Sequence, residues 1–379
     1  MEKPSKFEEY ETEGKLLLEE MLKEFANEYG QDLFDNLRIE LEPEKQKTII
    51  KQLEGIDFMA SDNDIKGLAY EHFLKGTMRQ KDGQFFTPRK VINFILDILQ
   101  PKQGAKILDP AAGSGGFLIA YYLHQKTEVE KQFYKGEITE KEKNQLLKDL
   151  STEFIHGVEL DEDLARLCMM NMIVHGDGHS MIFQGDGLSD IIHENRTYIG
   201  ENMFDLVLTN PPFGEPKIKK NDERMKRFDM GKSFKFEEDE IVFQQAKGDV
   251  VIRNQQEPQH MFVERVIRCL KPGGKAAIIL PDGIFNNSSD DYARRYIMKK
   301  CNILAVVSMP DLTFTKSGTS VRTNVLFIEK KVNEHVAQVN DIFMAICDNI
   351  GYNSKGEEIE ENDLVQISVK FKDTLLNNT

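Results

Sequence analysis

The sequence has few cysteines, no long apolar run and no excess of basic residues. Its four cysteines, Cys168, Cys269, Cys301 and Cys347, lie far apart and form no C-x-x-C pair, which disfavours a disulfide framework and a structural metal site. No stretch of about 18 residues is both apolar and uncharged, which excludes a membrane-spanning helix. The segment 1–10 lacks the basic and apolar regions of a secretory signal. We therefore expect a cytoplasmic protein with no bound metal and no membrane contact.

The charge balance limits the partners of the chain. It has 49 basic and 64 acidic residues, for a net charge of −15. Because phosphate backbones attract cationic surfaces, such a chain binds nucleic acid poorly unless it has a local basic patch or a partner.

The length of 379 residues predicts two or three domains, at roughly 100–200 residues each. Apolar spacing predicts helices over 8–30, 43–56 and 64–75. Short apolar runs then alternate with helical stretches, which is typical of βαβ units on a buried parallel sheet. We predict strands at 105–109, 154–160, 180–185, 204–209, 275–280, 303–308 and 323–329, and helices at 115–124, 162–175, 259–270 and 290–300.

The fold class is therefore α/β, with about seven mostly parallel strands after a helical N-terminal region. Segment 310–319 is too short for a crossover helix, so we expect the last strand to be antiparallel. We assign residues 1–82 to the helical region, 83–331 to the sheet domain and 332–379 to a short C-terminal extension, in which 339–347 resembles a strand. The charged insertion 125–152 predicts a solvated helical hairpin, and the polar insertion 214–258 predicts a mobile loop.

A small-residue loop follows the first predicted strand, in the segment 107–117, ILDPAAGSGGF. Such a loop brings backbone N–H groups close to a ligand at a helix N-terminus. The loop lacks the Lys-Ser or Lys-Thr pair of a phosphate-binding P-loop, and Leu118 stands where a dinucleotide fingerprint has its third glycine. The loop therefore predicts a ligand site while disfavouring hydride-transfer enzymes.

Acidic residues also end the next two predicted strands. Glu159 stands where a carboxylate accepts both ribose hydroxyl protons in nucleoside-binding α/β folds. The neighbouring Asp161 suits a helix cap. Asp186, followed by Gly187, suits a hydrogen bond to an adenine amino group, although such a residue alone also suits a simple turn. Together with the small-residue loop, these positions predict one adenosine-containing ligand across the strand tips.

The fourth motif is TNPPFG at 209–214. Its two prolines remove donors and stiffen the chain, which leaves the Asn210 side-chain oxygen and the Pro211 carbonyl as acceptors. Both could accept from an exocyclic amine such as adenine N6, and Phe213 could stack on the base. An Asn-Pro turn without function fits poorly at a strand end beside a nucleoside site.

These four motifs resemble those of S-adenosylmethionine-dependent amino-methyltransferases that act on DNA, with N-P-P-F as the catalytic tetrapeptide. GQFFTP at 83–88 resembles the segment that closes over the methionine end of the cofactor. With GLAYEHFL at 67–74 and KPGGKAAIILPDGIF at 271–285, residues 64–330 resemble the modification subunit of type I restriction–modification systems. The resemblance implies a Rossmann-like methyltransferase fold and a catalytic domain over 83–331.

The resemblance also implies the site residues. The catalytic set would be Asn210, Pro211, Pro212 and Phe213. S-adenosyl-L-methionine would bind Gln84, Phe85, Phe86, Thr87, Pro88, Asp109, Ala111, Gly113, Ser114, Gly115, Glu159, Asp186, Gly187 and Asn210. Independently, the basic residues of the second insertion are candidates for contact with DNA: Lys217, Lys219, Lys220, Arg224, Lys226 and Arg227.

The expected activity is methylation of adenine N6 in double-stranded DNA. About 50 residues follow 331, too few for a target-recognition domain, so we expect a separate specificity subunit to read the sequence. The family further implies two modification subunits per complex and a restriction subunit as an additional partner. Two alternatives stay open: an amino-methyltransferase acting on a protein glutamine or on RNA, and a non-catalytic scaffold that binds S-adenosylmethionine.

Overall fold

The computed structural model describes most of the chain from residue 87 onward and one helix before it. The described residues are 23, 24, 27, 41–53, 87–177, 181–193, 196–214, 216–238, 240–311, 313, 314, 321–338, 340–353 and 357–377. The predicted helix 43–56 is present as α3 (Pro43–Leu53). The predicted helix 64–75 lies outside the described residues, as does nearly all of 8–30.

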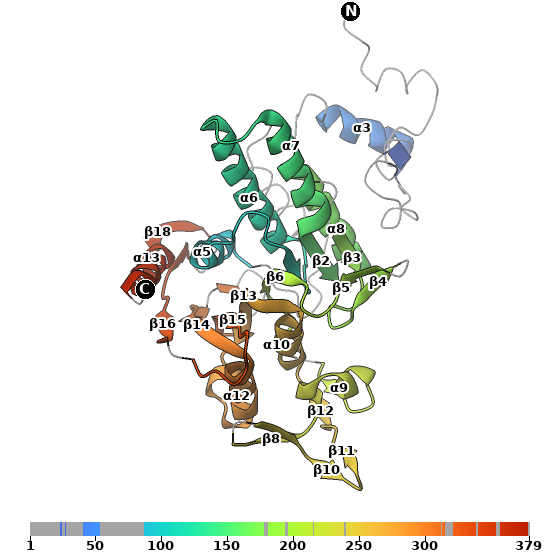
Figure 1. Ribbon diagram of the computed structural model, residues 1–379. Helices are drawn as coiled ribbons and strands as arrows, with labels where there is room; N and C mark the ends of the chain where they lie inside the picture. The colour runs from blue at the N-terminus through green and yellow to red at the C-terminus, as the bar shows by residue number, and fades with distance from the viewer. Residues whose placement is uncertain are drawn as a thin grey trace, which may run out of the picture.

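The centre of the molecule is an eight-stranded sheet, in the order β16-β14-β15-β13-β6-β1-β2-β3 (Figure 1). Its strands are β1 (Ile107–Asp109), β2 (Ile155–Glu159), β3 (Met181–Gln184), β6 (Phe204–Thr209), β13 (Leu270–Pro281), β14 (Cys301–Ser308), β15 (Thr323–Lys330) and β16 (Phe343–Ile346). Strand β15 runs antiparallel to both of its neighbours, and the other pairs are parallel. The seven predicted strands and the reversal of the last are therefore confirmed, and β16 lies within the strand-like piece at 339–347.

Helices cover both faces of this sheet. The main ones are α5 (Arg89–Leu99), α6 (Gly116–Tyr134), α8 (Glu162–Val174), α10 (Pro258–Cys269), α12 (Asp291–Lys300) and α13 (Asp363–Asn377). One hydrophobic cluster joins α5, α6, α8 and α13 to one face, and a second joins α10 and α12 to the other. Neighbouring strand residues alternate between them: Ile107 belongs to the first cluster and Leu108 to the second. Among the described helices, none has both the length and the apolar content to cross a bilayer.

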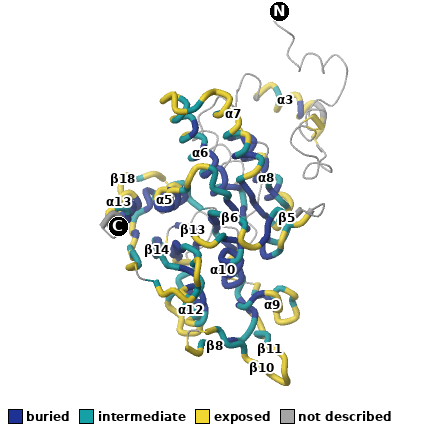
Figure 2. The backbone as a smooth tube through the Cα atoms, in the orientation of Figure 1, coloured by how far each residue is buried: buried dark blue, intermediate teal, exposed yellow. Residues whose placement is uncertain are grey.

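The charged insertion forms the predicted helical hairpin. Helix α6 continues into the insertion to Tyr134, and α7 (Glu140–Asp149) returns toward the sheet. A capping box begins α7, with Thr139 and Glu142 each accepting from the other's backbone N–H. A π-helical turn (Leu150–Phe154) leads into β2. Figure 2 shows mainly exposed and intermediate residues toward the free end of this hairpin, as its charged composition predicts.

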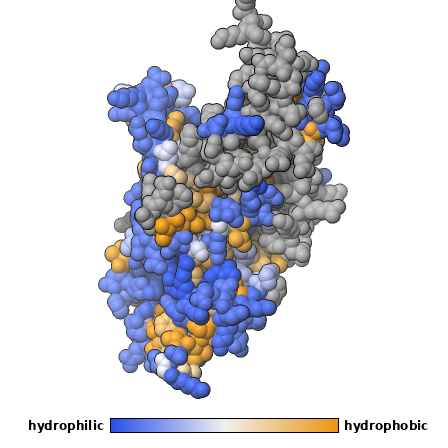
Figure 3. Space-filling view, turned by 90° about the vertical axis from the view of Figure 1, so that its right-hand side faces the viewer, coloured by the Kyte–Doolittle hydropathy of each residue, from blue (hydrophilic) through white to orange (hydrophobic). Residues whose placement is uncertain are grey.

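The second insertion is not the loop that its sequence predicts. It forms β7 (Ile218–Lys219), α9 (Glu223–Arg227), β8 (Phe234–Glu237), β9 (Glu240–Phe243), β10 (Gln245–Ala246), β11 (Asp249–Val250) and β12 (Gln255–Gln256). These elements are too short to show a periodicity in sequence. They are ordered by tertiary packing instead: Met225, Phe228 and Met230 are fully buried. Strand β8 pairs with β9 and β10 pairs with β11, and these two hairpins lie at the lower end of the molecule in Figure 1. Hydrophobic side chains gather at the same end of the face in Figure 3.

The C-terminal extension packs against helix α5. Strand β16 adds to the edge of the sheet, β17 (Ile350–Tyr352) pairs with β18 (Glu358–Asn362), and α13 contacts α5. Asp97 of α5 accepts hydrogen bonds from Ser368 and Lys372 of α13. The extension thereby supports the helix that directly follows Thr87 and Pro88. The remaining elements of the described residues are the hairpin β4 (Ile191–His193) and β5 (Arg196–Ile199), the short helix α11 (Gly283–Asn286) and two 3-10 helices, Asp229–Gly231 and Ser288–Asp290.

Candidate active site

Four of the predicted site residues lie at the ends of four neighbouring strands. Asp109 ends β1, Glu159 ends β2, Asp186 follows β3 and Asn210 follows β6. These strands are adjacent and parallel, in the order β6-β1-β2-β3. Their carboxyl ends therefore share one edge of the sheet, where the strand order reverses and α/β proteins bind ligands.

The small-residue loop begins at a buried carboxyl group. Asp109 is 1% exposed, and its Oδ1 accepts from the N–H of Ala111 at 3.0 Å. Burial raises the pKa of Asp109 to about 7, against the opposing effects of the Ala111 N–H and the Thr209 hydroxyl. Asp109 thus fixes the backbone at the start of the loop through its hydrogen bond with Ala111.

Two glycines allow the loop to turn into α6. Gly113 has a φ of 54° and Gly115 a φ of 85°, a region that side-chain-bearing residues rarely adopt. A Cβ on Gly115 would lie 2.8 Å from the Cys168 sulfur, whereas one on Gly113 would meet no atom within 4 Å. The loop is therefore closely packed on its inner side and open at Gly113. Asn171 of α8 fixes it further by donating to the Ser114 carbonyl at 2.9 Å.

Glu159 holds the same loop from the neighbouring strand. Its Oε2 accepts from the N–H of Gly113 at 2.9 Å, and its Oε1 accepts from the N–H of Asp161 at 3.0 Å. Burial raises its pKa above the usual value, despite these hydrogen bonds. A carboxylate has about four lone-pair sites, so Glu159 retains acceptor capacity for a ligand beside these hydrogen bonds. Asp161 caps α8 by accepting from Asp163 and Leu164, as predicted.

The Asp186-Gly187 turn packs directly against the small-residue loop. Asp186 Oδ1 accepts from the N–H of Leu188 at 3.0 Å, which closes a tight turn. A Cβ on Gly187 would lie 1.8 Å from the Pro110 carbonyl oxygen, so this position admits only glycine without movement of the backbone. The two loops are therefore in close contact at Gly187 and Pro110.

The N-P-P-F segment follows β6, the strand next to β1. The Asn210 Nδ2 donates to the Thr87 hydroxyl at 3.3 Å, which joins the end of β6 to the start of α5. Phe213 is 7% exposed and belongs to neither of the two hydrophobic clusters. Thr87 and Pro88 are thus at the site, while Gln84, Phe85 and Phe86 lie outside the described residues.

The predicted DNA-contact residues divide into two groups. Lys219 and Lys220 are exposed, Lys226 is exposed and pairs with Glu223 at 2.7 Å, and Lys217 pairs with Glu257 at 3.2 Å. Arg224 and Arg227 instead contact the turn after β3: Arg224 reaches Asp186, and Arg227 donates to the Leu188 carbonyl.

The family model described as N-6 DNA Methylase matches residues 61–377. The chain belongs to this family. The membership confirms the resemblance seen in the motifs, since it spans every strand and helix that carries them. It also spans the C-terminal extension up to the end of α13.

Several relatives of the chain are methylase subunits of type I restriction enzymes. The EcoEI methylase subunit of Escherichia coli is 29% identical over 75% of this chain and 50% of its own length. The EcoKI methylase subunit of Escherichia coli strain K12 is 27% identical over 79% of this chain and 52% of its own. The chain thus spans about half the length of these curated relatives.

Solved structures confirm the methyltransferase fold. The type I restriction-modification system methyltransferase subunit from Streptococcus thermophilus superposes with a TM-score of 0.67 at 22% identity. The match covers 97% of this chain and 72% of that one.

Asn171 builds the candidate site but carries no local signal, because it lies mid-helix on α8. Thr87 and Asn210 each lie in a predicted motif, but their pairing across 123 positions has no local signal. Arg265 does carry a signal: it is a charged residue four positions after Met261, on the inward face of α10. A charge on a buried helical stripe predicts a specific polar partner, and the turn after β3 supplies it.

Proposed function

We propose that the chain transfers the methyl group of S-adenosyl-L-methionine to N6 of adenine in duplex DNA. The supporting observation is the position of Asn210-Pro211-Pro212-Phe213 at the end of β6, next to the small-residue loop after β1. This arrangement would place an acceptor for the target amine beside a nucleoside site, as suits a member of the N-6 DNA Methylase family.

The residues at the strand tips fit S-adenosylmethionine. Gly113 leaves open space above the loop, and Glu159 keeps lone pairs for the two ribose hydroxyls. Asp186 would accept from the adenine amino group. The loop from Asp109 to Gly115, with the 84–88 segment, would hold the methionine end. When bound, S-adenosylmethionine supplies an electrophilic methyl carbon, whose bond to sulfur breaks as the bond to the target nitrogen forms.

Asn210 and Pro211 would position the target amine. Their carbonyl oxygens accept its two hydrogens, which directs the nitrogen lone pair toward the methyl group. N6 then loses a proton to water. The hydrogen bond that the Asn210 amide donates to the Thr87 hydroxyl fixes the direction of the Asn210 side chain. Phe213 would stack on an adenine flipped from the duplex, whose extrusion costs a few kcal/mol. Most of the rate would come from positioning, without a general base.

The proposed assembly is a type I complex in the cytoplasm. The curated relatives are named as methylase subunits, and a net charge of −15 opposes unaided DNA binding. A separate specificity subunit would read the sequence, two copies of this chain would bind it, and a restriction subunit would be a further partner. Lys217, Lys219, Lys220 and Lys226 are the proposed phosphate contacts.

The test is transfer of radiolabelled methyl groups from S-adenosylmethionine to duplex DNA. The chain is assayed alone and then with the specificity protein encoded beside it. Label only with the partner, recovered as N6-methyladenine, supports the proposal. Label with the chain alone contradicts the need for a specificity subunit. Label in protein or RNA but not in DNA overturns the proposed substrate, and binding without any transfer favours a scaffold.

A further inference from the structure

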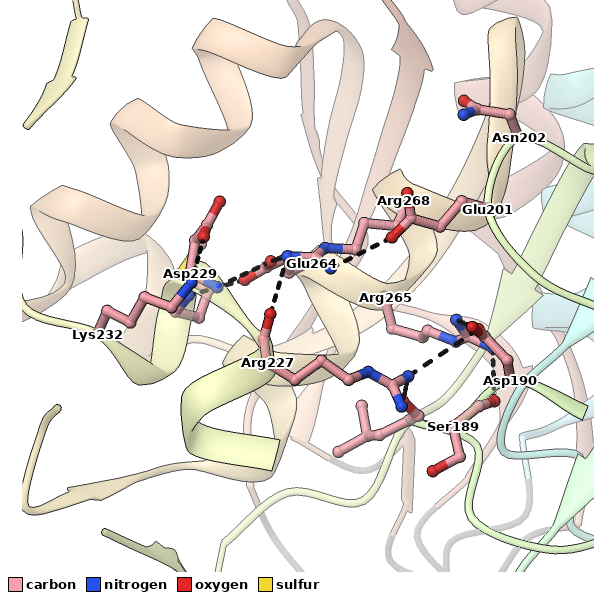
Figure 4. A network of polar contacts seen from close by, with 12 residues as sticks. Ser189, Asp190, Glu201, Asn202, Arg227, Asp229, Lys232, Glu264, Arg265 and Arg268 are labelled. Atoms are coloured by element: carbon pink, nitrogen blue, oxygen red, sulfur yellow. Dashed lines mark hydrogen bonds and ion pairs between the residues drawn. The ribbon is translucent and has the colours of Figure 1, made fainter. Parts of the chain in front are cut away.

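Three arginines from two helices surround the turn formed by residues 186–190. Arg265 comes from α10, and Arg224 and Arg227 come from α9. Their guanidinium groups donate to every residue of the turn. They reach the carboxylates of the two terminal residues and the backbone carbonyl oxygens of the three residues between them. Figure 4 shows Arg227 and Arg265 directed toward Ser189 and Asp190. We call these three residues the arginine clamp.

Arg265 is the buried member of the clamp. It is 1% exposed, and its three guanidinium nitrogens each donate to the turn. Nε donates to the Gly187 carbonyl at 3.0 Å, Nη2 to the Ser189 carbonyl at 2.6 Å and Nη1 to Asp190 Oδ1 at 2.7 Å. Burying a guanidinium is costly unless its donors are satisfied. An apolar side chain of similar volume would fill the same space without the free-energy cost of burying a charge. The arginine at this position therefore indicates that the turn must be held in one geometry.

The two α9 residues hold the turn from the other side. Arg224 Nη1 lies 3.3 Å from Asp186 Oδ2, while its Nε and Nη2 are fixed by Asp222 at 2.9 and 2.6 Å. Arg227 donates to the Leu188 carbonyl and lies 4.0 Å from Asp190. Both side chains are thus directed at the Asp186 turn, although the composition of the segment alone suggests phosphate contacts.

The clamp acts on a turn that is already fixed at its other end. Gly187 packs against the Pro110 carbonyl so closely that a Cβ would lie 1.8 Å from it. Within the turn, Asp186 Oδ1 accepts from Leu188 and its carbonyl accepts from Ser189 at 2.8 Å. Asp186 Oδ1 and Oδ2 are therefore each held by a separate donor. Such a carboxylate has a fixed direction for its remaining lone pairs.

We propose that Arg224, Arg227 and Arg265 are positioning residues that orient Asp186 toward the exocyclic amino group of the cofactor's adenine, and so make the site select a 6-aminopurine over a 6-oxopurine. The inference rests on the proposed function, because it assumes an adenosine ligand at this edge of the sheet. A fixed carboxylate accepts from the amino group of adenine, whereas it faces the oxygen of hypoxanthine with no hydrogen to accept. Sites that hydrogen-bond one group reject analogues that lack it, provided that the acceptor cannot move away.

The test compares two ligands on the intact chain by calorimetry: S-adenosylhomocysteine and S-inosylhomocysteine, which differ in the 6-amino group. We expect the unmodified chain to prefer the adenosyl ligand by more than about tenfold. Arg265→Met and Arg224→Met should reduce the preference to less than about threefold, chiefly by weakening the adenosyl ligand. Arg265→Lys should not restore it, because a single ammonium cannot reach three acceptors in a fork geometry.

Arg268→Met is the matched control. Arg268 lies on the same helix and pairs with the fully buried Glu264 (Figure 4). Its other side-chain contacts are to Glu201, the Arg227 carbonyl and the Phe228 ring, all outside the turn 186–190. Its loss should lower stability and leave the ligand preference unchanged. Thermal melts of every variant separate folding from selectivity, and Arg224→Met, at a partly exposed side chain, carries the test if Arg265→Met does not fold.

The outcomes separate this inference from the proposed function. If Arg265→Met and Arg224→Met keep the preference of the unmodified chain, or weaken both ligands equally, the clamp has only a structural role and the inference is overturned. If Arg265→Lys restores the preference, charge alone is sufficient and the positioning role is also wrong. If the unmodified chain binds neither ligand, the proposed cofactor itself fails, and the inference fails with it.

Discussion

Asp109 illustrates how burial changes the chemistry of a single carboxyl group. It ends β1 beneath the small-residue loop, and its pKa is raised to about 7 by loss of solvent. In the unfolded chain the Asp109 carboxyl group has a pKa of 3.8. Between about pH 4 and 7, Asp109 therefore binds a proton in the native state that it does not bind in the unfolded state. Stability therefore falls as pH rises through this window, and the full cost is present above the folded pKa.

Asp109→Asn should remove this cost. The measurement is urea unfolding of both proteins at about pH 5 and about pH 8. From the lower to the higher pH, the free energy of unfolding of the Asn variant should rise relative to that of the unmodified protein by on the order of 2 kcal/mol. The amide keeps an oxygen for the Ala111 N–H, so the loop should persist. A difference that does not change with pH would mean that Asp109 is ionised throughout the range.

Asn210 carries the proposed chemistry, and its loss should affect transfer more than binding. Asn210→Ala should abolish methylation while S-adenosylmethionine affinity stays nearly intact, because in the proposed site the small-residue loop and Glu159 would hold the cofactor from other strands. Single-turnover methylation and calorimetry on the same samples make the comparison. A loss of cofactor affinity of about tenfold or more would refute this division of roles.

At the level of elements, α13 packs against α5 and supports it. Phe371 of α13 is 3% exposed and packs edge-on against Phe343 of β16, with ring centroids 5.5 Å apart. Helix α5 in turn begins two residues after Thr87, the hydrogen-bond partner of Asn210. The extension after residue 331 is thus connected to the active site through one helix.

Phe371→Ala should lower the free energy of unfolding by about 3 kcal/mol or more, the usual cost of removing a buried aromatic ring. Val369→Ala, at a side chain on the same helix that is 54% exposed, is the control, and it should change stability by less than about 0.5 kcal/mol. Denaturant melts measure both. Equal effects from the two substitutions would show that α13 does not stabilise the sheet domain.

At the level of the whole molecule, the net charge of −15 makes each exposed cation near the site important. Lys219 and Lys220 are exposed at the end of β7, and they remain the simplest candidates for phosphate contacts. The arginines of α9, by contrast, contact the turn after β3.

Changing Lys219 and Lys220 to Gln should reduce the slope of log affinity against log salt by about two, because each phosphate that a lysine neutralises contributes roughly 0.9 to that slope. The measurement uses the complex with the specificity subunit bound to duplex DNA. Lys141→Gln, at an exposed side chain on α7, is the control and should leave the slope unchanged. An unchanged slope in the double variant would place the DNA elsewhere.

The succession of strands and helices along the chain, the reversed last strand and the motifs at the strand ends were all predictable from the sequence. Strands buried on both faces read as short apolar runs, and their ends are marked by residues that the backbone geometry requires, such as Gly113 and Gly115. The helical hairpin at 125–152 was predictable for a similar reason, because its charge pattern is local. These features depend on neighbours along the chain.

Tertiary structure alone decided the remainder. The insertion at 214–258 is ordered by burial of Met225, Phe228 and Met230 rather than by its own periodicity. The Thr87–Asn210 hydrogen bond and the contacts of Arg265 join positions 123 and about 75 residues apart. The sequence shows the charge of a guanidinium but not its surroundings, since the charge is the same whether the side chain faces solvent or a neighbouring turn. Which of the two it faces is decided by the elements that pack beside it.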